Sequence, residues 1–498
     1  RRVFLSRAHW RQKCLELKGV LQEMQEECAE TEAHWRQRER ENIELRERVS
    51  QLELELAQPR PATLPLGEAP RGQHYGAGMI ALCVNLAREI GLRAAVRALR
   101  VVFDWLGATA EIPSYQTIRL WMQRIGLDRM QSVKKVSGGV WLTDHTNQIG
   151  KEKVMVVLRV SGRRLPRQGI PLRHEDVEVL AVMPGEEWKR EDVGKVYQAT
   201  AERYGYPRAI ESDGAVELRE PAEKLGKLRE KPLVLRDPKH FLANKFEALL
   251  RQDAQYQAFV QKHGGARSAL QQTELAHLMP PAFKVKARFM NLAPMLSWAS
   301  AILWHLDHPE SQSRRGVTES RMIEKLGWVR DFASSIQQWQ VCQEVVSTAL
   351  TFINRQGIFR GAAKQFRKLA TRLTHHPMSQ QLVRTVVEFL RKNERELRPD
   401  ERLPLSTEVL ESSFALYKQL EKQHSKSGFT SLLLAYPTLP RATTPREVAR
   451  SFARVKVADV KHWVENHLPS TLTSKRLLMF REARTNTQDS ATALHAAA

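Results

Sequence analysis

Three acidic residues stand where a catalytic role explains them better than burial does. Asp144 interrupts a stretch whose apolar alternation is typical of a β-strand, and burying an acid there is unfavourable unless a cation or donor meets it. Asp213 closes the fourth expected strand and precedes Gly214, which lets backbone or ligand approach closely. Taken alone, this residue is better explained as a simple strand-ending Asp-Gly turn. Glu411 lies inside a late helical segment. Glu211 competes with Asp213, because residues two apart share one face of a strand.

Carboxylates that converge from separate elements can hold two divalent metal ions about 4 Å apart, with positions left for water and phosphate oxygens. Acids on a first strand, on a neighbouring fourth strand and on a late helix can converge in this way. We therefore expect Asp144, Asp213 and Glu411 to bind two Mg²⁺ or Mn²⁺ ions in each active site. The chemistry expected of such a site is attack by activated water on a phosphodiester.

The late helix offers two acids for the third position. Glu408 follows Ser406 closely, and an acid in the first turn satisfies the helix dipole without any catalytic role. Glu411 lies one turn later and is followed by Ser412 and Ser413, whose small side chains leave room for a ligand. We therefore favour Glu411 as the third metal ligand.

A mixed α/β region positions the first two acids. Its strands are expected at 139–146, 153–160, 178–183, 207–213 and 232–236, with helices at 191–204 and 215–225. The resulting order is β-β-β-α-β-α-β. It does not suit a doubly wound nucleotide-binding fold, in which strands and helices alternate from the start.

Strand signals vanish from residue 241 to about residue 400, so this region is expected to be all-helical. Its segment 352–373 carries basic residues and no acid, which indicates a phosphate-contacting surface more than a solvated face. These basic residues are Arg355, Arg360, Lys364, Arg367, Lys368 and Arg372. Four tryptophans could stack on a flipped base, although burial in a core is the commoner explanation. They are Trp298, Trp304, Trp328 and Trp339.

The first segment has a heptad pattern. Alternating steps of four and three residues place Asn42 and Val49 at a positions and Leu45 and Leu52 at d positions. The full seam is Trp10, Cys14, Leu17, Leu21, Met24, Cys28, Thr31, Trp35, Arg38, Asn42, Leu45, Val49, Leu52 and Leu56. This pattern predicts a parallel two-stranded coiled coil, in which Asn42 fixes the register. A single surface helix is the alternative.

Three helical patterns follow between residues 74 and 130. Ser114 is a suitable N-cap for the third, which is short and amphipathic. Its polar face is expected to enter a DNA major groove, as the last helix of a helix-turn-helix does, and an ordinary three-helix packing module is the alternative. The residues of that face are Tyr115, Gln116, Arg119 and Gln123.

The amino-acid composition is that of a basic globular protein. The 498 residues include 78 Lys and Arg against 56 Asp and Glu, a net charge of +22 that indicates a polyanionic partner. Hydrophobic residues make up 42%, which is typical of a globular protein. Apolar runs are too short for a membrane span, and no secretion signal or CxxC pair is present. We expect a cytoplasmic protein associated with a prokaryotic nucleoid.

The acids, the order of elements and one further motif together resemble a known family. The sequence RDPKH places Asp237 and His240 just after the fifth strand. This resembles the Asp/Cys-x-x-His signature of hAT and Mutator-like transposases and related bacterial insertion-sequence transposases, whose RNase H-like domain is likewise interrupted by a helical insertion. The resemblance covers about residues 75 to 440. An N-cap followed by Pro at the first helical position explains Asp237 equally well.

The resemblance implies a DDE transposase that binds transposon ends and target DNA as a homodimer, or a higher oligomer, and catalyses phosphodiester hydrolysis and strand transfer. It implies catalytic roles for Asp144, Asp213 and Glu411, while His240 would contact the scissile phosphate or order the site. A structure-selective nuclease and a non-catalytic regulator derived from a transposase are the alternatives. The expected domains are a coiled coil (1–57), a linker (58–73), a helix-turn-helix (74–130), an RNase H-like domain in two parts (131–245 and 401–440), a helical insertion (246–400) and a C-terminal helical segment with a tail (441–498).

Overall fold

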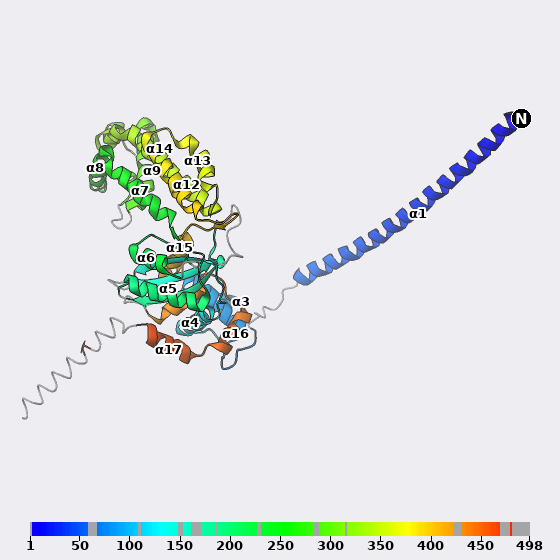
Figure 1. The fold of residues 1–498 in the computed structure, drawn as a ribbon, viewed down its shortest axis with the longest axis horizontal. Coiled ribbons are helices and arrows are strands. Elements are labelled where there is room, and N and C mark those ends of the chain that lie inside the picture. The colour runs from blue at the N-terminus through cyan, green and yellow to red at the C-terminus, as the bar shows by residue number, and fades with distance from the viewer. Residues whose placement is uncertain are drawn as a thin grey trace, which may run out of the picture. The chain divides into compact units, whose positions relative to one another are not determined.

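The computed structural model describes residues 2–57, 67–107, 111–147, 153–160, 171–185, 187–226, 231–282, 288–313, 316–422, 430–468 and 479–480. Most of the expected linker (58–66) and nearly all of the expected tail lie outside the described residues. The chain divides into two units, and the first unit contains the N-terminal helix. The second unit holds the sheet and the candidate site. The protein is mostly helical with one small mixed sheet of five strands (Figure 1).

The first unit is built on one continuous helix, α1 (Arg2–Ala57). Large apolar side chains such as Trp10, Leu21, Leu45 and Leu52 are exposed along it. Ion pairs and hydrogen bonds between residues four apart, such as Arg36 with Glu32, follow its surface. An isolated helix of this kind has no core of its own, so its apolar seam is available to a partner.

A five-stranded sheet forms the centre of the second unit. Its strands lie in the order β3-β2-β1-β4-β5, with β1, β2 and β3 antiparallel and β1, β4 and β5 parallel. The bounds are β1 (Val140–Asn147), β2 (Lys153–Val160), β3 (Val177–Gly185), β4 (Ala209–Ser212) and β5 (Leu233–Arg236). With α5 (Arg190–Tyr204) and α6 (Val216–Lys224), the chain follows the predicted order β-β-β-α-β-α-β.

Helices cover both faces of the sheet. Trp141 and Ile210 point toward α5 and α6 and pack there around Tyr197. Since strand residues alternate between faces, Leu142 and Glu211 point the opposite way. That second face is covered by α4 (Tyr115–Gln131), α15 (Glu408–Lys422) and the 3-10 segment η6 (Ser431–Thr438). Further elements around it are α2 (Ala77–Ile90), α3 (Leu92–Leu106), η2 (His174–Asp176), α16 (Pro445–Arg454) and α17 (Val457–His467).

Between β5 and α15 the chain forms a group of helices, seen together in the upper part of Figure 1. They are α7 (Pro238–Gln252), α8 (Ala254–Leu270), η3 (Ala276–Leu278), α9 (Arg288–Asp307), α10 (Glu310–Ser313), α11 (Glu319–Leu326), η4 (Gly327–Phe332), α12 (Ala333–Gln356), α13 (Ala362–Leu369), η5 (Ala370–Leu373) and α14 (Pro377–Arg395). The expectation of an all-helical insertion is wrong in one detail. β6 (Ile358–Phe359) pairs antiparallel with β7 (Arg402–Leu403), because these short segments meet where the chain returns to the sheet.

The expected recognition helix is mostly buried. Gln123 is only 5% exposed, and its side chain and that of Arg119 both donate hydrogen bonds to Ser431 Oγ, at 2.9 and 2.6 Å. Tyr115 is half-buried with a guanidinium over its ring, so Gln116 alone of the four predicted DNA contacts is exposed. The prediction of a solvent-facing reading face on α4 is wrong, because the apolar run of η6 covers it.

Gly126 explains how closely η6 packs on α4. A Cβ atom at this position would lie 1.8 Å from the carbonyl oxygen of Leu434, so only glycine fits. From the other side, α16 and α17 also pack on α4. The segments 74–105, 111–130 and 441–468 therefore belong to one compact unit with the sheet, rather than forming separate domains.

Among the described helices, none combines the length and the apolar character that a membrane span requires.

Candidate active site

The sheet brings the first two predicted acids to one position. The parallel pairing of β1 with β4 aligns Leu142 with Glu211. Continuing this register by two residues brings Asp144 level with Asp213, and neighbouring strands lie about 4.8 Å apart. Both acids then project toward the face that α15 covers, which is the helix that carries Glu411. Three acids separated by up to 267 positions in sequence are therefore near enough for the charges of Asp213 and Glu411 to act on Asp144. Their carboxylate oxygens do not form a group within 4.8 Å of one another, as the ligand atoms of Asp237, His240 and Glu411 do.

Asp144 is the acid most strongly affected by this crowding. Burial and the neighbouring carboxylate of Asp213 raise its pKa to about 7, and Glu411 adds to the effect. One hydrogen bond opposes the shift, donated by the backbone N–H of His145 to Oδ1 at 2.7 Å. The fold thus holds a buried carboxylate with too little compensating positive charge, which is the situation that a bound cation relieves.

Asp213 occupies a tight turn after β4. Its Oδ1 accepts a hydrogen bond from the backbone N–H of Ala215 at 2.8 Å. Gly214 follows with a φ of +89°, a conformation that L side chains rarely adopt. The sequence prediction of a strand-ending turn and the prediction of a functional acid are therefore both compatible with this geometry.

The RDPKH motif forms a hydrogen-bonded pair at the start of α7. Asp237 is the N-cap of this helix, with Pro238 in the first turn, as the alternative interpretation predicted. Its Oδ2 accepts hydrogen bonds from the backbone N–H of His240 at 2.9 Å and from its Nδ1 at 2.8 Å. Its Oδ1 accepts from the backbone N–H of Thr407 at 3.1 Å. Asp237 is only 1% exposed and is fully used in holding neighbouring groups.

The contact between Asp237 and His240 affects the pKa of both side chains and the orientation of the imidazole ring. The hydrogen bond to Asp237 raises the pKa of His240, while burial opposes that change. Although burial works against ionisation, the hydrogen bonds from His240 and Thr407 keep the pKa of Asp237 below its usual value. Because Nδ1 is bound to Asp237, Nε2 is the ring nitrogen that can meet a ligand. His240 thus presents Nε2 beside the acids, and the hydrogen bond to Asp237 favours the charged form of the ring.

Glu411 has a partner that the sequence did not suggest. Lys239 Nζ lies 2.5 Å from Glu411 Oε2, and both side chains are about one third exposed. Ligand atoms of Asp237, His240 and Glu411 also lie within 4.8 Å of one another. Lys239 was missed because its interpretation depends on a residue 172 positions later in the sequence. The only available signal was its place inside the RDPKH motif.

The competing acids have other roles. Glu211 is 0% exposed and neither of its carboxylate oxygens has a well-formed hydrogen bond. Burial and the charge of Asp237 raise the pKa of Glu211 well above its usual value, more than the nearby N–H of Ser406 lowers it. Burial thus favours the neutral form of Glu211 under the site. Glu408 is exposed and accepts a hydrogen bond from Asn354.

The two serines after Glu411 do not leave the open space that was expected. Ser413 is fully buried and shares a hydrogen bond with the hydroxyl of Tyr436. Ser412 lies 2.7 Å from His174 Nε2 through its hydroxyl oxygen. That part of the sequence analysis is wrong, because small residues on this helix serve packing against η6 and contact with a loop.

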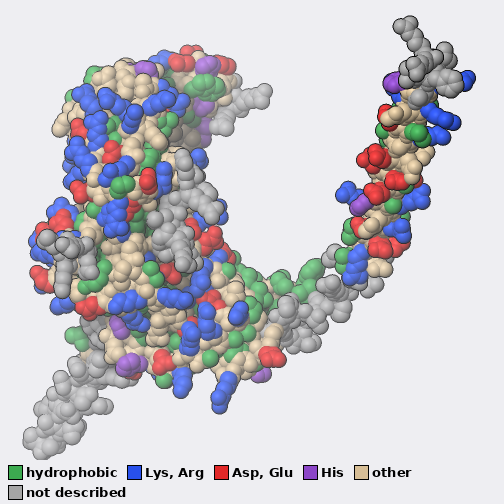
Figure 2. All heavy atoms as spheres, turned by 45° about the vertical axis from the view of Figure 1, so that its right-hand side comes forward, with side chains coloured by type: hydrophobic (Ala, Val, Ile, Leu, Met, Phe, Trp, Pro, Cys, Tyr) green, Lys and Arg blue, Asp and Glu red, His purple; other side chains and the backbone are tan. Residues whose placement is uncertain are grey.

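The basic residues predicted to contact phosphate are exposed on the helical insertion. The four tryptophans of the insertion differ in how far they are exposed. Lys364, Arg367 and Lys368 lie on the solvent side of α13, and Figure 2 shows many Lys and Arg side chains over the helical part of this unit. Arg360 is exposed too, but its guanidinium donates to the carbonyl oxygen of Leu397. Trp339 is fully buried and Trp298 and Trp328 are partly buried, whereas Trp304 is 53% exposed.

Asp144, Asp213 and Glu411 offer carboxylate oxygens, the ligand type that Mg²⁺ and Mn²⁺ prefer. Burial is the main cause of the raised pKa of Asp144, and the charges of Asp213 and Glu411 add to it. Asp237 and His240 are better explained as a positioning pair, since the hydrogen bonds of Asp237 already engage both of its oxygens. No protein-family model and no curated protein matches this chain, so the site is interpreted from its own residues.

Proposed function

We propose that this chain is a DDE-type DNA transposase with an RNase H-like catalytic domain, which cleaves and joins DNA strands at Asp144, Asp213 and Glu411. One observation carries the proposal: neighbouring parallel strands and a helix from beyond the insertion direct these acids to one place, where the pKa of Asp144 rises to about 7. The order of sheet elements on which the resemblance rests supports it further.

The protein residues have distinct tasks in such a reaction. Asp144, Asp213 and Glu411 would hold two Mg²⁺ or Mn²⁺ ions, and such ions lower the pKa of bound water and stabilise charge on phosphate oxygens. His240 would donate a hydrogen bond from Nε2 to a phosphate oxygen of the substrate. Asp237 positions His240 by binding its Nδ1. Lys239 would leave Glu411 and contact the DNA strand once the carboxylate binds a cation.

The DNA surface is best assigned to the helical insertion. Lys364, Arg367 and Lys368 are exposed on α13, no acid occurs in the surrounding segment 352–373, and the chain carries a charge of +22. A helix-turn-helix reading face on α4 is no longer part of the proposal, because Arg119 and Gln123 bond to Ser431. The contacts on α13 would neutralise phosphates without reading the sequence of bases.

Dimerisation is best assigned to α1. Its heptad seam is exposed in the single chain, and a parallel pairing would place Glu41 near Arg46 of the second copy and Arg48 near Glu53. We expect removal of residues 1–57 to halve the mass measured by light scattering without DNA. An unchanged mass would move the dimer interface to the second unit.

Metal-dependent nicking of supercoiled plasmid DNA tests the catalytic proposal. Asp144→Asn, Asp213→Asn and Glu411→Gln should each lower the rate at least about 1,000-fold, because a hard cation loses a charged ligand. Glu408→Gln and Glu211→Gln are matched controls and should keep most activity, since Glu408 contacts Asn354 and burial favours the neutral form of Glu211.

Each other outcome points elsewhere. Full activity of Asp144→Asn would reject this site. Nicking without any strand joining, measured with a pre-cut DNA end, would favour a structure-selective nuclease. DNA binding without cleavage in Mg²⁺ or Mn²⁺ would favour a regulator.

A further inference from the structure

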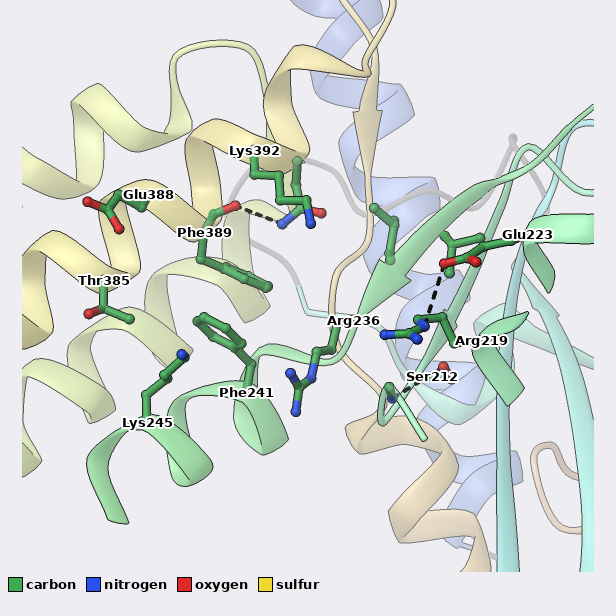
Figure 3. Close-up of a pocket in the computed structure, with 14 residues that line it drawn as sticks. Ser212, Arg219, Glu223, Arg236, Phe241, Lys245, Thr385, Glu388, Phe389 and Lys392 are labelled. Atoms are coloured by element: carbon green, nitrogen blue, oxygen red, sulfur yellow. Dashed lines mark hydrogen bonds and ion pairs between the residues drawn. The ribbon is translucent and has the colours of Figure 1, made fainter. Parts of the chain in front are cut away.

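A cavity of about 480 Å³ lies beside the candidate site (Figure 3). Ser212 and Gly214, which flank Asp213, form one part of its wall. The other parts come from α6, from β5 at the edge of the sheet, and from α7 and α14 of the helical insertion. The cavity therefore joins the catalytic loop to the insertion, and its volume falls within the range of small-ligand sites.

Three cationic side chains line this cavity without an acidic partner. They are Arg236 on β5, Lys245 on α7 and Lys392 on α14. In the described part of the chain, none of the three forms an ion pair. Arg219 differs, since its guanidinium lies 3.5 Å from Glu223. Unpaired cations gathered around one cavity indicate an anionic ligand, because like charges repel unless an anion lies between them.

Arg236 is held in place by packing. A Cβ atom on Gly214 would lie 2.7 Å from Arg236 Nε, so the missing side chain lets the arginine lie against the loop that carries Asp213. Arg236 Nε is buried and has no hydrogen-bond partner among the described residues. An unsatisfied buried donor costs free energy, so this N–H is available to a ligand.

An aromatic pair forms the apolar part of the wall. The rings of Phe241 and Phe389 stack with their centroids 4.5 Å apart and an interplanar angle of 21°, as Figure 3 shows. Arg236 Cζ lies 5.4 Å and Lys245 Nζ lies 5.7 Å from the centroid of the Phe241 ring. Cations next to aromatic faces are the combination that proteins use to bind single-stranded nucleic acids, whose backbone is anionic and whose bases stack.

We propose that this cavity binds one nucleotide of a single DNA strand next to the cleaved bond. Arg236, Lys245 and Lys392 would hold its phosphate, and the Phe241–Phe389 pair would contact its base. A duplex is too wide for a cavity of 480 Å³, so the strand must be unpaired there. This inference rests on the proposed function for its substrate, but its test needs binding alone.

The test measures binding of the single-stranded oligonucleotide dT4 to the full chain in EDTA by calorimetry at two salt concentrations. Arg236→Met and Lys392→Met should each weaken binding five- to twentyfold and reduce the slope of log affinity against log salt by about 0.7 per cation removed. A dT4 analogue with an uncharged methylphosphonate backbone should bind the wild type and both variants equally. Lys392 is exposed, so its replacement leaves the fold intact even where Arg236→Met does not.

Two further variants sharpen the result. Lys195→Met, on the exposed surface of α5, is the charge-matched control and should leave dT4 affinity unchanged. Glu388→Gln removes an acid from the cavity wall and should tighten binding two- to fivefold.

Normal dT4 affinity in Lys392→Met and Arg236→Met would overturn the inference, as would an equal loss of affinity for a hairpin duplex of the same charge. If the wild-type chain nicks plasmid DNA but both variants keep normal dT4 affinity, only the cavity proposal is rejected. If the chain binds dT4 through the cavity but never nicks DNA, only the proposed function is rejected.

Discussion

Two regions of the second unit bury charged side chains, and they treat them in opposite ways. On α4, Arg129 is 8% exposed and donates to both carboxylate oxygens of Glu447, at 3.0 and 2.9 Å. It also donates to the carbonyl oxygens of Pro437 and Arg441 at 3.1 and 3.0 Å. At the candidate site, Asp144 has one backbone hydrogen bond and faces other acids.

The difference shows which buried charge is structural. Although burial opposes its ionisation, hydrogen bonds from Arg129 hold the pKa of Glu447 below its usual value. Burial and the charge of Asp213 instead raise the pKa of Asp144. A buried charge whose hydrogen bonds are complete stabilises the fold. A half-buried carboxylate that faces other acids instead of a counter-charge resists ionisation, and such perturbed groups are common at functional sites.

Replacing Arg129 by methionine should show the largest effect on stability. The change leaves the Glu447 carboxylate buried without its main partner, so the free energy of unfolding should fall by about 3–5 kcal/mol. Chemical denaturation at pH 7 measures this. The double variant Arg129→Met with Glu447→Gln should recover part of the loss. A fall below 1 kcal/mol would remove the contrast between the two regions.

The pH dependence of stability should have opposite signs in the two regions. The folded chain keeps a proton on Asp144 up to pH 7, whereas an unfolded chain releases it near pH 4. The free energy of unfolding in EDTA should therefore fall as pH rises from 4 to 7, with a contribution of roughly 2–4 kcal/mol from Asp144. Asp144→Asn should reduce that slope, and the raised pKa of Glu211 should account for part of what is left. The contribution of Glu447 should instead be lost as pH falls below about 4.5. An unchanged slope in Asp144→Asn would assign it to other groups.

An exposed ion pair serves as a reference for the two buried regions, and breaking it should change the free energy of unfolding least. Arg190 Nη1 lies 2.8 Å from Glu220 Oε2, and the two side chains are 56% and 28% exposed. Glu220→Gln should change the free energy of unfolding by less than about 1 kcal/mol, because solvent screens the pair. A larger loss would mean that distance alone, rather than burial, sets the energy of ion pairs in this protein.

The sequence predicts local elements well and distant contacts poorly. Alternation with a period of two placed Asp144 on a strand, and the short segment before Asp213 was recognised for the same reason. The burial of Gln123 was missed, since the helical pattern of α4 shows a polar face and cannot show that η6 covers it. The Lys239–Glu411 contact was missed because it joins residues 172 positions apart.

The hydrogen bond from the Thr407 N–H to Asp237 Oδ1 joins residues 170 positions apart. This hydrogen bond connects the segment just before the helical insertion to the segment just after it. A chain emerging from the ribosome carries Asp144, Asp213 and His240 long before it carries α15. Such a nascent chain lacks Glu411 and has no way to hold the ends of the insertion together. The order of synthesis therefore delays assembly of the site until most of the protein has been made.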